Sequence, residues 1–570
     1  MQDYVPPLDD IRFVMEHVAG GGEIASWPGL EHCTADLRDA VLGEAGRFAA
    51  SELAPLNAAA DLEGAVLENG VVRTATGFRE AYRGFAEAGW VGLAAAPDLG
   101  GQGLPWLWNT AANELWAAAN VSFQLCPLLS QAVIDAIQHH GSAEQQRLYG
   151  EPLTSGRWTG AMCLTEPQAG SDVGALRTRA VPDGGRYRIH GTKVFITYGE
   201  HGLAENIVHL VLARIDGAPA GSKGLSLFIV PKFLPNEDGT PGQRNDLRCV
   251  SLEHKLGVRA SPTCVMAYGD DEGAAGWLIG EPGDGMRCMF TVMNNARLAV
   301  GHQGLGVAER AFQQALAYAR ERVQGHRDGR SAPIIEHLDV RRMLLTMRAK
   351  IAAMRALSYW TAAFVDRSER HPDAAERSRA ADRVALLTPM VKAWCTDLAV
   401  DIASLGIQVH GGMGFIEETC AAQHLRDARI LPIYEGTNGI QALDLVGRKL
   451  SLAGGELPRS LLRELREELL DLPAELQPGL SAALDAVERA TKRLQDCAPD
   501  DRGAGAVPYL HLFAGTLGGF LLARGAGAAD SADWPALARF YVTALLPSTV
   551  ALEAAATAGA DLLDAPLPAA

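Results

Sequence analysis

The residues best suited to chemistry lie in one short stretch, RILPIYEGTNGIQ, at positions 429–441. Glu435 follows Tyr434 and precedes a turn-forming Gly-Thr-Asn-Gly run, and the residues from Ile440 to Leu450 are predicted to form a helix. An acid at this place has two interpretations. It can cap the helix together with Thr437, which is the commoner role of such acids, or it can be a general base in an apolar pocket.

Three other motifs have a chemical and a plain interpretation. GAMCLTEPQAGSDVGALRTRA, at 160–180, supplies hydroxyls and glycines that could wrap a polar planar ligand, or it is a turn-rich entry into a sheet. The glycine pair of GIQVHGGMGFIEE, at 406–418, predicts a helix C-cap or a phosphate or adenine contact. In ARERVQGH, Arg320 and Arg322 could hold a pyrophosphate, although solvated helix-end cations are commoner.

Composition excludes several classes of function. The chain has 570 residues and a formal net charge of -17, which argues against nucleic acid or an anionic membrane surface as a partner. Its nine cysteines are scattered singly, so we expect free thiols, a reducing compartment and no metal site. We find no signal peptide and no apolar run near the roughly 18 residues of a membrane span, and we expect a cytoplasmic protein without a membrane span.

Periodicity predicts a mainly α chain with a central β domain. Helical spacing dominates from Asp36, alternating β-branched residues take over near Trp158, and four long amphipathic helices follow, as in a bundle. The β domain is a barrel or a sandwich. The predicted divisions are an N-terminal extension (1–35), an N-terminal helical domain (36–158), a middle β domain (159–282), a C-terminal helical bundle (283–452) and an additional C-terminal helical domain (453–570).

The motifs LTEPQAGSD, VFIT, ARERVQGH, QVHGGMGF and RDARILPIYEGTNGIQ, in this order, resemble the signatures of acyl-CoA dehydrogenases over roughly residues 36–450. The resemblance implies the family's fold: an N-terminal helical domain, a middle β-barrel and a C-terminal four-helix bundle. The extra C-terminal helical region and finer features, such as EHKLGVRAS, resemble the branch that includes the 3-methylmercaptopropionyl-CoA dehydrogenases and longer bacterial relatives of broad chain length.

The resemblance also implies FAD as cofactor and assigns site residues. Glu435 is the implied catalytic base, since the alternative base position of some relatives holds Ala296 here. The implied FAD-binding residues are Met162, Cys163, Leu164, Thr165, Gly170, Ser171, Phe195, Ile196, Thr197, Arg322, Gln408, Val409, His410, Gly411, Gly412, Thr437 and Asn438. The implied substrate contacts are Ser171, Arg297 and Gly436.

The implied reaction is the α,β-dehydrogenation of an acyl-CoA thioester to the trans-2-enoyl-CoA. Glu435 removes the α-proton, its pKa raised by burial, and electrons pass to electron-transferring flavoprotein. Because part of the FAD site crosses a subunit interface in the family, a homodimer or a dimer of dimers is implied. Two alternatives stay open: an acyl-CoA oxidase that uses oxygen, and a non-catalytic acyl-CoA-binding scaffold.

Overall fold

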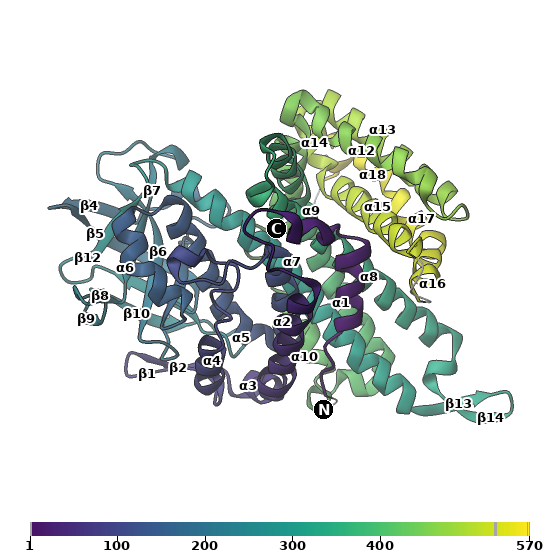
Figure 1. Cartoon of the computed structure of the whole chain (residues 1–570), viewed down its shortest axis with the longest axis horizontal. Coiled ribbons are helices and arrows are strands. Elements are labelled where there is room, and N and C mark those ends of the chain that lie inside the picture. Colours follow the sequence, from purple (N-terminus) through teal and green to yellow (C-terminus); the bar gives the residue numbers. More distant parts are fainter. Residues whose placement is uncertain (1–2, 529–532, 567, 569–570) are drawn as a thin grey trace. The chain divides into compact units, whose positions relative to one another are not determined.

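The computed structural model describes residues 3–528, 533–566 and 568. The chain divides into two compact units. The first unit comprises Met1–Arg47, Pro105–Ala118 and Arg297–Ala570, and the second comprises Phe48–Leu104 and Ala119–Ala296. Each unit is therefore made of separate segments of the chain. The helices α5 (Trp106–His140) and α7 (Gly285–Glu321), labelled in Figure 1, each contribute residues to both units.

The second unit is built around an eight-stranded sheet. Its strands are β3 (Trp158–Cys163), β4 (Arg179–Asp183), β5 (Arg186–Thr197), β6 (Asn206–Ile215), β7 (Leu225–Pro231), β10 (Leu247–Leu252), β11 (Thr263–Tyr268) and β12 (Ala274–Ile279). Five of them close a ring, because β5 pairs with β12, β12 with β7, β7 with β6, β6 with β4, and β4 again with β5. This ring confirms the predicted barrel, and β3 lies parallel to β6 beside it.

Smaller elements precede the barrel strands along the chain or lie between them. They are α3 (Asn57–Glu63), α4 (Phe78–Glu87), α6 (Ala143–Thr154) and the hairpins β1 (Val66–Glu68) with β2 (Val71–Arg73) and β8 (Phe233–Pro235) with β9 (Pro241–Arg244). Ser142 and Gln145 form a capping box at the start of α6. Within α5, Asn120 leaves the helical conformation (φ -161°, ψ 92°) and its side chain accepts a hydrogen bond from Phe123 N. This bond restarts the helix after the break.

The first unit contains the predicted bundle. Its helices are α7, α8 (Leu338–Arg370), α9 (Ala374–His410), α10 (Ala421–Ala428) and α11 (Asn438–Gly447). The helix α7 buries apolar residues that include Leu298, Leu305 and Phe312. The fourth predicted helix differs from the other three, since α11 has only 10 residues. It begins where the Thr437 hydroxyl accepts a hydrogen bond from Ile440 N.

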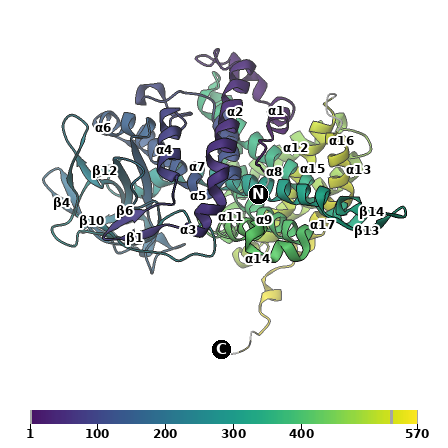
Figure 2. The ribbon, with the colours of Figure 1, turned by 90° about the horizontal axis from the view of Figure 1, so that it is seen from below.

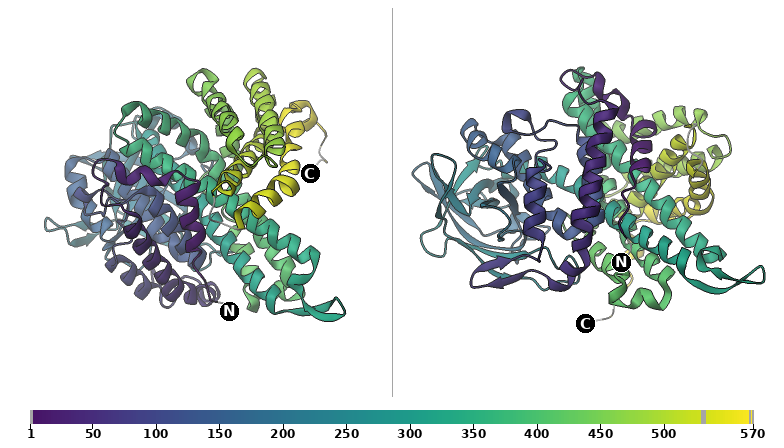
Figure 3. Two further views of the ribbon diagram at one scale, coloured as in Figure 1. Left: turned by 45° about the vertical axis from the view of Figure 1, so that its right-hand side comes forward. Right: turned by 60° about the horizontal axis from the view of Figure 1, so that its bottom comes forward.

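The C-terminal region adds a layer of helices to the bundle (Figure 3). They are α12 (Glu456–Glu468), α13 (Gln477–Asp496), α14 (Pro499–Ala504), α15 (Ala506–Ala526), α16 (Asp533–Phe540), α17 (Leu546–Val550) and α18 (Leu552–Thr557). The apolar α15 lies at the centre of this layer and packs against α8, α9, α11 and α13. The N-terminal extension is also ordered, since α1 (Leu8–His17) packs on α8, and α2 (Ala35–Phe48) follows it.

A two-stranded hairpin, β13 (Val323–Arg327) with β14 (Arg330–Pro333), joins α7 to α8. Figures 1 and 2 show it standing away from the bundle helices. Most of its side chains are exposed on the single chain. The hairpin begins one residue after Arg322, so that arginine lies at the base of an exposed projection.

Three helical segments of the described chain are long and apolar enough to span a membrane by length and composition: Trp106–His140, Ala506–Ala526 and Asp533–Thr557. The expectation that the chain has no membrane span therefore stays a prediction. Polar residues such as Asn113 and Glu114 interrupt the first segment, so it is not a continuous apolar run. Its mean hydropathy is nevertheless high enough for a membrane span. The most apolar windows of the first two segments are 94% and 83% buried within the protein, and that of the third is 28% buried.

Candidate functional site

Glu435 lies in a strained turn just before α11. Its φ is 55°, a left-handed conformation that is uncommon for a glutamate and that concentrates at functional sites. The cap of α11 is Thr437, whose hydroxyl accepts from Ile440 N at 3.3 Å. In the described part of the chain the carboxylate of Glu435 makes no hydrogen bond, so helix capping does not explain this residue.

Two cations face Glu435 within the first unit. Burial raises the pKa of the Glu435 carboxyl above its ordinary value, and the charges of Arg297 and Lys392 partly oppose this rise. Lys392 is itself fully buried on α9, and burial lowers its pKa to about 7. A carboxylate held with a raised pKa beside cations is suited to accept a proton near neutral pH.

The surroundings of Glu435 contain buried polar atoms that have no partner in the described chain. They are Arg297 Nε and both amide atoms of Gln441, a side chain that is fully buried. The backbone N–H of Glu435 also donates to no group of the described residues. Gly436 (φ 85°) brings the backbone so close that a Cβ here would lie 2.5 Å from Gln441 Nε2. Unsatisfied buried groups are costly, and their convergence indicates a ligand that would satisfy them.

In the second unit, the predicted flavin loop is held by one buried ion pair. Lys193 Nζ on β5 donates to Glu166 Oε1 at 2.8 Å and to Leu164 O at 2.9 Å. Burial opposes ionisation of Glu166, but the charge of Lys193 and the hydrogen bonds that Glu166 accepts hold its pKa at about 2. Glu166 also accepts from the backbone N–H groups of Arg177 and Thr178, at 2.7 and 3.0 Å. The loop is thus rigid before any ligand binds.

The structure brings the two predicted flavin segments of this unit together. Val194 N, which directly precedes Phe195, donates to Thr165 O at 2.9 Å. Phe195 has φ 61° and is 62% exposed, an unusual state for a large apolar side chain. Met162, Cys163 and Ile196 are buried, so their side chains face the protein core, and Thr165 and Thr197 are half-buried. Gly170 and Ser171 are exposed.

The predicted pyrophosphate residues lie at the adjoining ends of α7 and α9 in the first unit. The ring of His410 stacks on that of Tyr318 with centroids 4.5 Å apart, and Arg322 N donates to Tyr318 O. Arg322, Gln408, Gly411 and Gly412 are exposed, whereas Val409 and His410 are buried. Gly411 has φ 61° and ends α9, as the plain interpretation of the glycine pair predicts.

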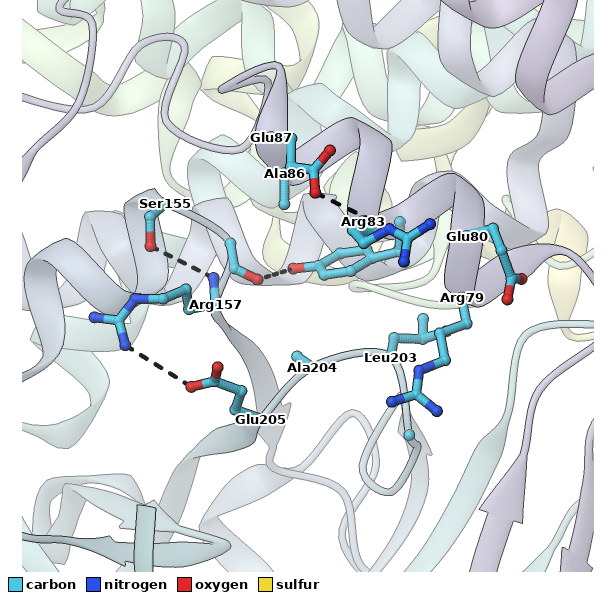
Figure 4. A pocket seen from close by; sticks show the side chains of 13 residues that line it. Arg79, Glu80, Arg83, Ala86, Glu87, Ser155, Arg157, Leu203, Ala204 and Glu205 are labelled. Atoms are coloured by element: carbon cyan, nitrogen blue, oxygen red, sulfur yellow. Dashed lines mark hydrogen bonds and ion pairs between the residues drawn. The ribbon is translucent and has the colours of Figure 1, made fainter. Parts of the chain in front are cut away.

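A cavity of about 670 Å³ in the second unit lies apart from these residues. Figure 4 shows that arginines and glutamates line it, with Arg157 directed toward Glu205 and Arg83 toward Glu87. No residue predicted to bind a flavin or a substrate is among its lining residues. Its charged groups are largely paired with one another, and it offers no convergent set of unsatisfied donors.

Sequence reasoning missed two residues beside Glu435. Lys392 is a lone cation within the apolar run LLTPMVKAWC, a signal that could have identified it, because a buried lysine is rare. Gln441 stands at the end of the motif that includes Glu435, but only its buried, unpartnered amide distinguishes it from a polar helix residue.

Family models match the chain in four consecutive segments. They are described as the acyl-CoA dehydrogenase N-terminal domain (residues 36–157), middle domain (161–270) and C-terminal domain (283–450), and as acetyl-CoA dehydrogenase C-terminal like (461–566). The first three follow the order expected from the sequence motifs. The fourth covers most of the added C-terminal helices.

Individual relatives agree with these matches. The chain is 47% identical over 546 residues to the 3-methylmercaptopropionyl-CoA dehydrogenase of Ruegeria pomeroyi, covering 93% of this chain and 92% of that one. It is 37% identical to a butyryl-CoA dehydrogenase of Syntrophomonas wolfei, over 72% of this chain and 69% of that one. Among solved structures, Caenorhabditis elegans ACDH-11 in complex with C11-CoA shares the fold, with a TM-score of 0.78, 23% identity, and coverage of 95% of this chain and 92% of that one.

Proposed function

Because the chain belongs to the acyl-CoA dehydrogenase family, we propose that it oxidises an acyl-CoA thioester to the trans-2-enoyl-CoA with Glu435 as the base. The observation that carries this proposal is the state of Glu435. Its carboxylate accepts no hydrogen bond from the residues that the structure describes, its pKa is raised by burial, and it faces two cations. A residue that only capped a helix would need none of these features.

The residues present fit FAD, the cofactor of the family. Within the second unit, the loop at 162–171 and the exposed Phe195 offer backbone groups and an apolar face to a planar ring. Thr437 and Asn438, in the first unit, stay predicted flavin contacts. Arg322, Gln408, Gly411 and Gly412 offer a cation and free backbone to a pyrophosphate. Since these groups are exposed on the single chain, we propose that they bind the cofactor within a homodimer or a dimer of dimers. When bound, FAD supplies the two-electron acceptor that takes the β-hydrogen as a hydride at N5.

The chain's own residues then perform the proton chemistry. A thioester α-proton is weakly acidic, and its removal requires hydrogen bonds to the carbonyl oxygen that strengthen as negative charge develops. The free backbone N–H of Glu435 is a donor for this oxygen, held in place by the strained turn. Glu435 accepts the α-proton, and Arg297 and Gly436 of the same unit contact the acyl-CoA, Arg297 through an Nε that has no partner among the described residues. Ser171, in the second unit, stays a predicted substrate contact. We propose electron-transferring flavoprotein as the acceptor of the electrons.

The proposed function is tested by adding thioesters to the purified yellow protein without oxygen and following the flavin absorbance. We expect bleaching with 3-methylmercaptopropionyl-CoA, the substrate in the name of the 47% identical relative, and we use butyryl-CoA for comparison. The two acyl chains differ by one sulfur atom, and a group of about the size of a methylene is worth only about 1–3 kcal/mol, so both thioesters are informative. Peroxide formed in stoichiometric amount on admitting air would indicate an oxidase, and no bleaching with any thioester would refute the catalytic proposal.

The role of Glu435 is tested by Glu435→Gln. We expect the variant to keep FAD and to bleach at least about a hundredfold more slowly, since this is the low end of the contribution of a general base. Glu418→Gln is a matched control, because Glu418 is an exposed acid on the same unit. A bleaching rate in Glu435→Gln close to that of the wild-type protein would contradict the assignment.

A further inference from the structure

Lys392, which the proposed reaction does not use directly, is the end of a continuous polar chain within the first unit. Its ammonium Nζ donates to Asn438 Oδ1 at 2.8 Å. The amide Nδ2 of Asn438 donates in turn to Asp397 Oδ1, also at 2.8 Å. The other oxygen of that carboxylate, Asp397 Oδ2, lies 3.0 Å from His511 Nε2. The chain connects helices α9, α11 and α15, and α15 belongs to the added C-terminal region.

The amide of Asn438 can adopt only one orientation in this chain. Its carbonyl oxygen faces an ammonium, and its NH₂ group faces the Asp397 carboxylate, the Thr396 hydroxyl and Ala393 O. A flipped amide would place donors against the cation and an acceptor against the carboxylate, which is unfavourable at both ends. The position of Asp397 thus determines the position of Asn438, the first residue of α11, three residues after Glu435.

The charged groups around Lys392 favour a role in the electrostatics of the base. Glu435 and Asp397 stabilise the ammonium form of Lys392, whereas Arg297 opposes it. Glu435 in turn faces only Arg297 and Lys392 among the charged groups of the described chain. The charges of Asp444 and Arg448, from the α11 segment, also act on Arg297. From α15, His511 is the group that reaches this set, and it does so through Asp397.

We propose that His511, Asp397 and Asn438 are positioning residues through which the C-terminal region holds the Lys392 ammonium in place to set the proton affinity of Glu435. The proposal rests on the proposed function for the role of Glu435. It gives the added region a part in catalysis although none of its residues needs to touch the substrate. Without His511, Asp397 loses its donor from α15, Asn438 is no longer held, and Lys392 stabilises the Glu435 carboxylate less.

The test measures the pH dependence of anaerobic flavin bleaching in a single turnover. His511→Phe keeps a ring but removes the donor, and Asp397→Asn keeps the shape of its side chain. We expect each to raise the apparent pKa of bleaching by roughly 0.5 to 1 unit, the range of coupling found within one polar network. The double variant should shift no further than the larger single shift. His511→Gln, which retains an N–H donor, should restore part of the shift.

Arg524→Met is the matched control on the same helix. Arg524 donates to both carboxylate oxygens of Glu468, at 2.6 and 2.8 Å, so its loss weakens the attachment of α15 without touching the chain to Lys392. We expect a lower Tm and an unchanged apparent pKa. An unshifted pKa in both His511→Phe and Asp397→Asn, additive shifts in the double variant, or a shift of equal size in Arg524→Met would overturn the proposal.

A second readout does not depend on turnover. The pH titration of the Lys392 ε-carbon can be followed by NMR in protein labelled with [ε-¹³C]lysine and free of substrate. We expect the midpoint pH of this titration to change in His511→Phe and to stay the same in Arg524→Met. An unchanged midpoint in His511→Phe would contradict the proposed polar chain. If none of the thioesters bleaches the wild-type protein but the titration of Lys392 changes in His511→Phe, then the proposed function fails while the connection from His511 to Lys392 stands.

Discussion

Two clusters of buried charge in the first unit differ in how well their polar atoms are satisfied. In the Arg355 cluster, made of Glu114, Glu309, Arg355 and Tyr359, the guanidinium donates to both glutamates at distances from 2.6 to 3.3 Å. Tyr359 donates to Glu114, and Gln313 donates to Glu309. The Glu435 cluster, made of Arg297, Lys392, Glu435 and Gln441, has no such saturation, since Arg297 Nε and the Gln441 amide have no partner in the described chain.

This difference separates a structural role from a functional one better than burial or charge does. Burial raises the pKa of both Glu114 and Glu435, and an arginine opposes the rise in each case. Every carboxylate oxygen of the Arg355 cluster has a donor, so its carboxylates are complete without a ligand. Arg355 Nη1 makes no hydrogen bond among the described residues, but it lies 3.6 Å from Asp10 Oδ2. The Glu435 cluster retains unsatisfied groups that each cost about 1–3 kcal/mol, a cost that a bound ligand removes.

The largest expected effect on stability is in the complete cluster. Arg355→Met leaves two buried carboxylates without their cation, and breaking a buried pair in this way costs about 3–5 kcal/mol. We expect a clearly lower Tm, with an unchanged bleaching rate per folded molecule. Arg342→Gln on the same helix is the control, since its pair with Asp339 is exposed and its Tm should stay near that of the wild type. A wild-type Tm in Arg355→Met would show that the cluster is not structural.

The contrast between the clusters could be predicted from the sequence only in part. The order of helical and β segments and the stretch around Glu435 are local patterns, so they could be predicted, and the family models and the structure agree. The residue pattern left a barrel and a sandwich open, and the barrel was implied only by the family resemblance. The role of Glu435 does not follow from its own stretch and stays a proposal. The turn geometry and the finding that Thr437 caps the helix support it.

The rest of the site depends on distant segments that tertiary packing brings together. Lys392 stands 43 positions before Glu435, and His511 comes from a helix more than 70 positions after it. Each is a single polar residue in an apolar stretch, and no spacing rule relates them. Likewise, the polar residues that interrupt Trp106–His140 hid the apolar character of a helix that is buried in the protein.

A smaller effect is expected when one of the two cations of the Glu435 cluster is removed, and it should exceed the effect of removing another buried cation. Lys392→Met removes a charge that lowers the pKa of Glu435, so we expect the apparent pKa of bleaching to rise by about one unit. Lys449→Met is the control, because Lys449 is also buried enough to have a lowered pKa but faces Asp444, Arg448 and Arg297. An equal rise in both variants would show that the effect is a general loss of positive charge.

The same variant has a consequence for stability against pH. Lys392 has a folded pKa of about 7, and a free lysine has one of about 10.4, so the folded protein binds fewer protons between these values. This group therefore makes the free energy of unfolding rise with pH across that window. Lys392→Met should reduce the slope of this rise by the equivalent of about one bound proton. The slope is measured by urea unfolding at several pH values between 7 and 10. An unchanged slope would contradict the lowered pKa.

The smallest expected effect tests the unsatisfied amide itself. Gln441→Leu replaces two buried, unpartnered polar atoms with apolar ones, so we expect the protein free of FAD and substrate to gain about 1 kcal/mol in stability. In contrast, Gln423→Leu removes a buried glutamine that donates to Asp427 Oδ2 at 3.2 Å, and it should lose about as much.

The two glutamine variants should also differ in how much bound ligands raise their Tm. If the Gln441 amide is unsatisfied because a ligand completes it, then the rise in Tm on binding FAD and acyl-CoA should be smaller in Gln441→Leu than in the wild type. The rise should be unchanged in Gln423→Leu, whose amide already has a partner in the protein. A loss of stability in ligand-free Gln441→Leu, with the full rise on binding, would mean that this amide belongs with the complete Arg355 cluster in being structural.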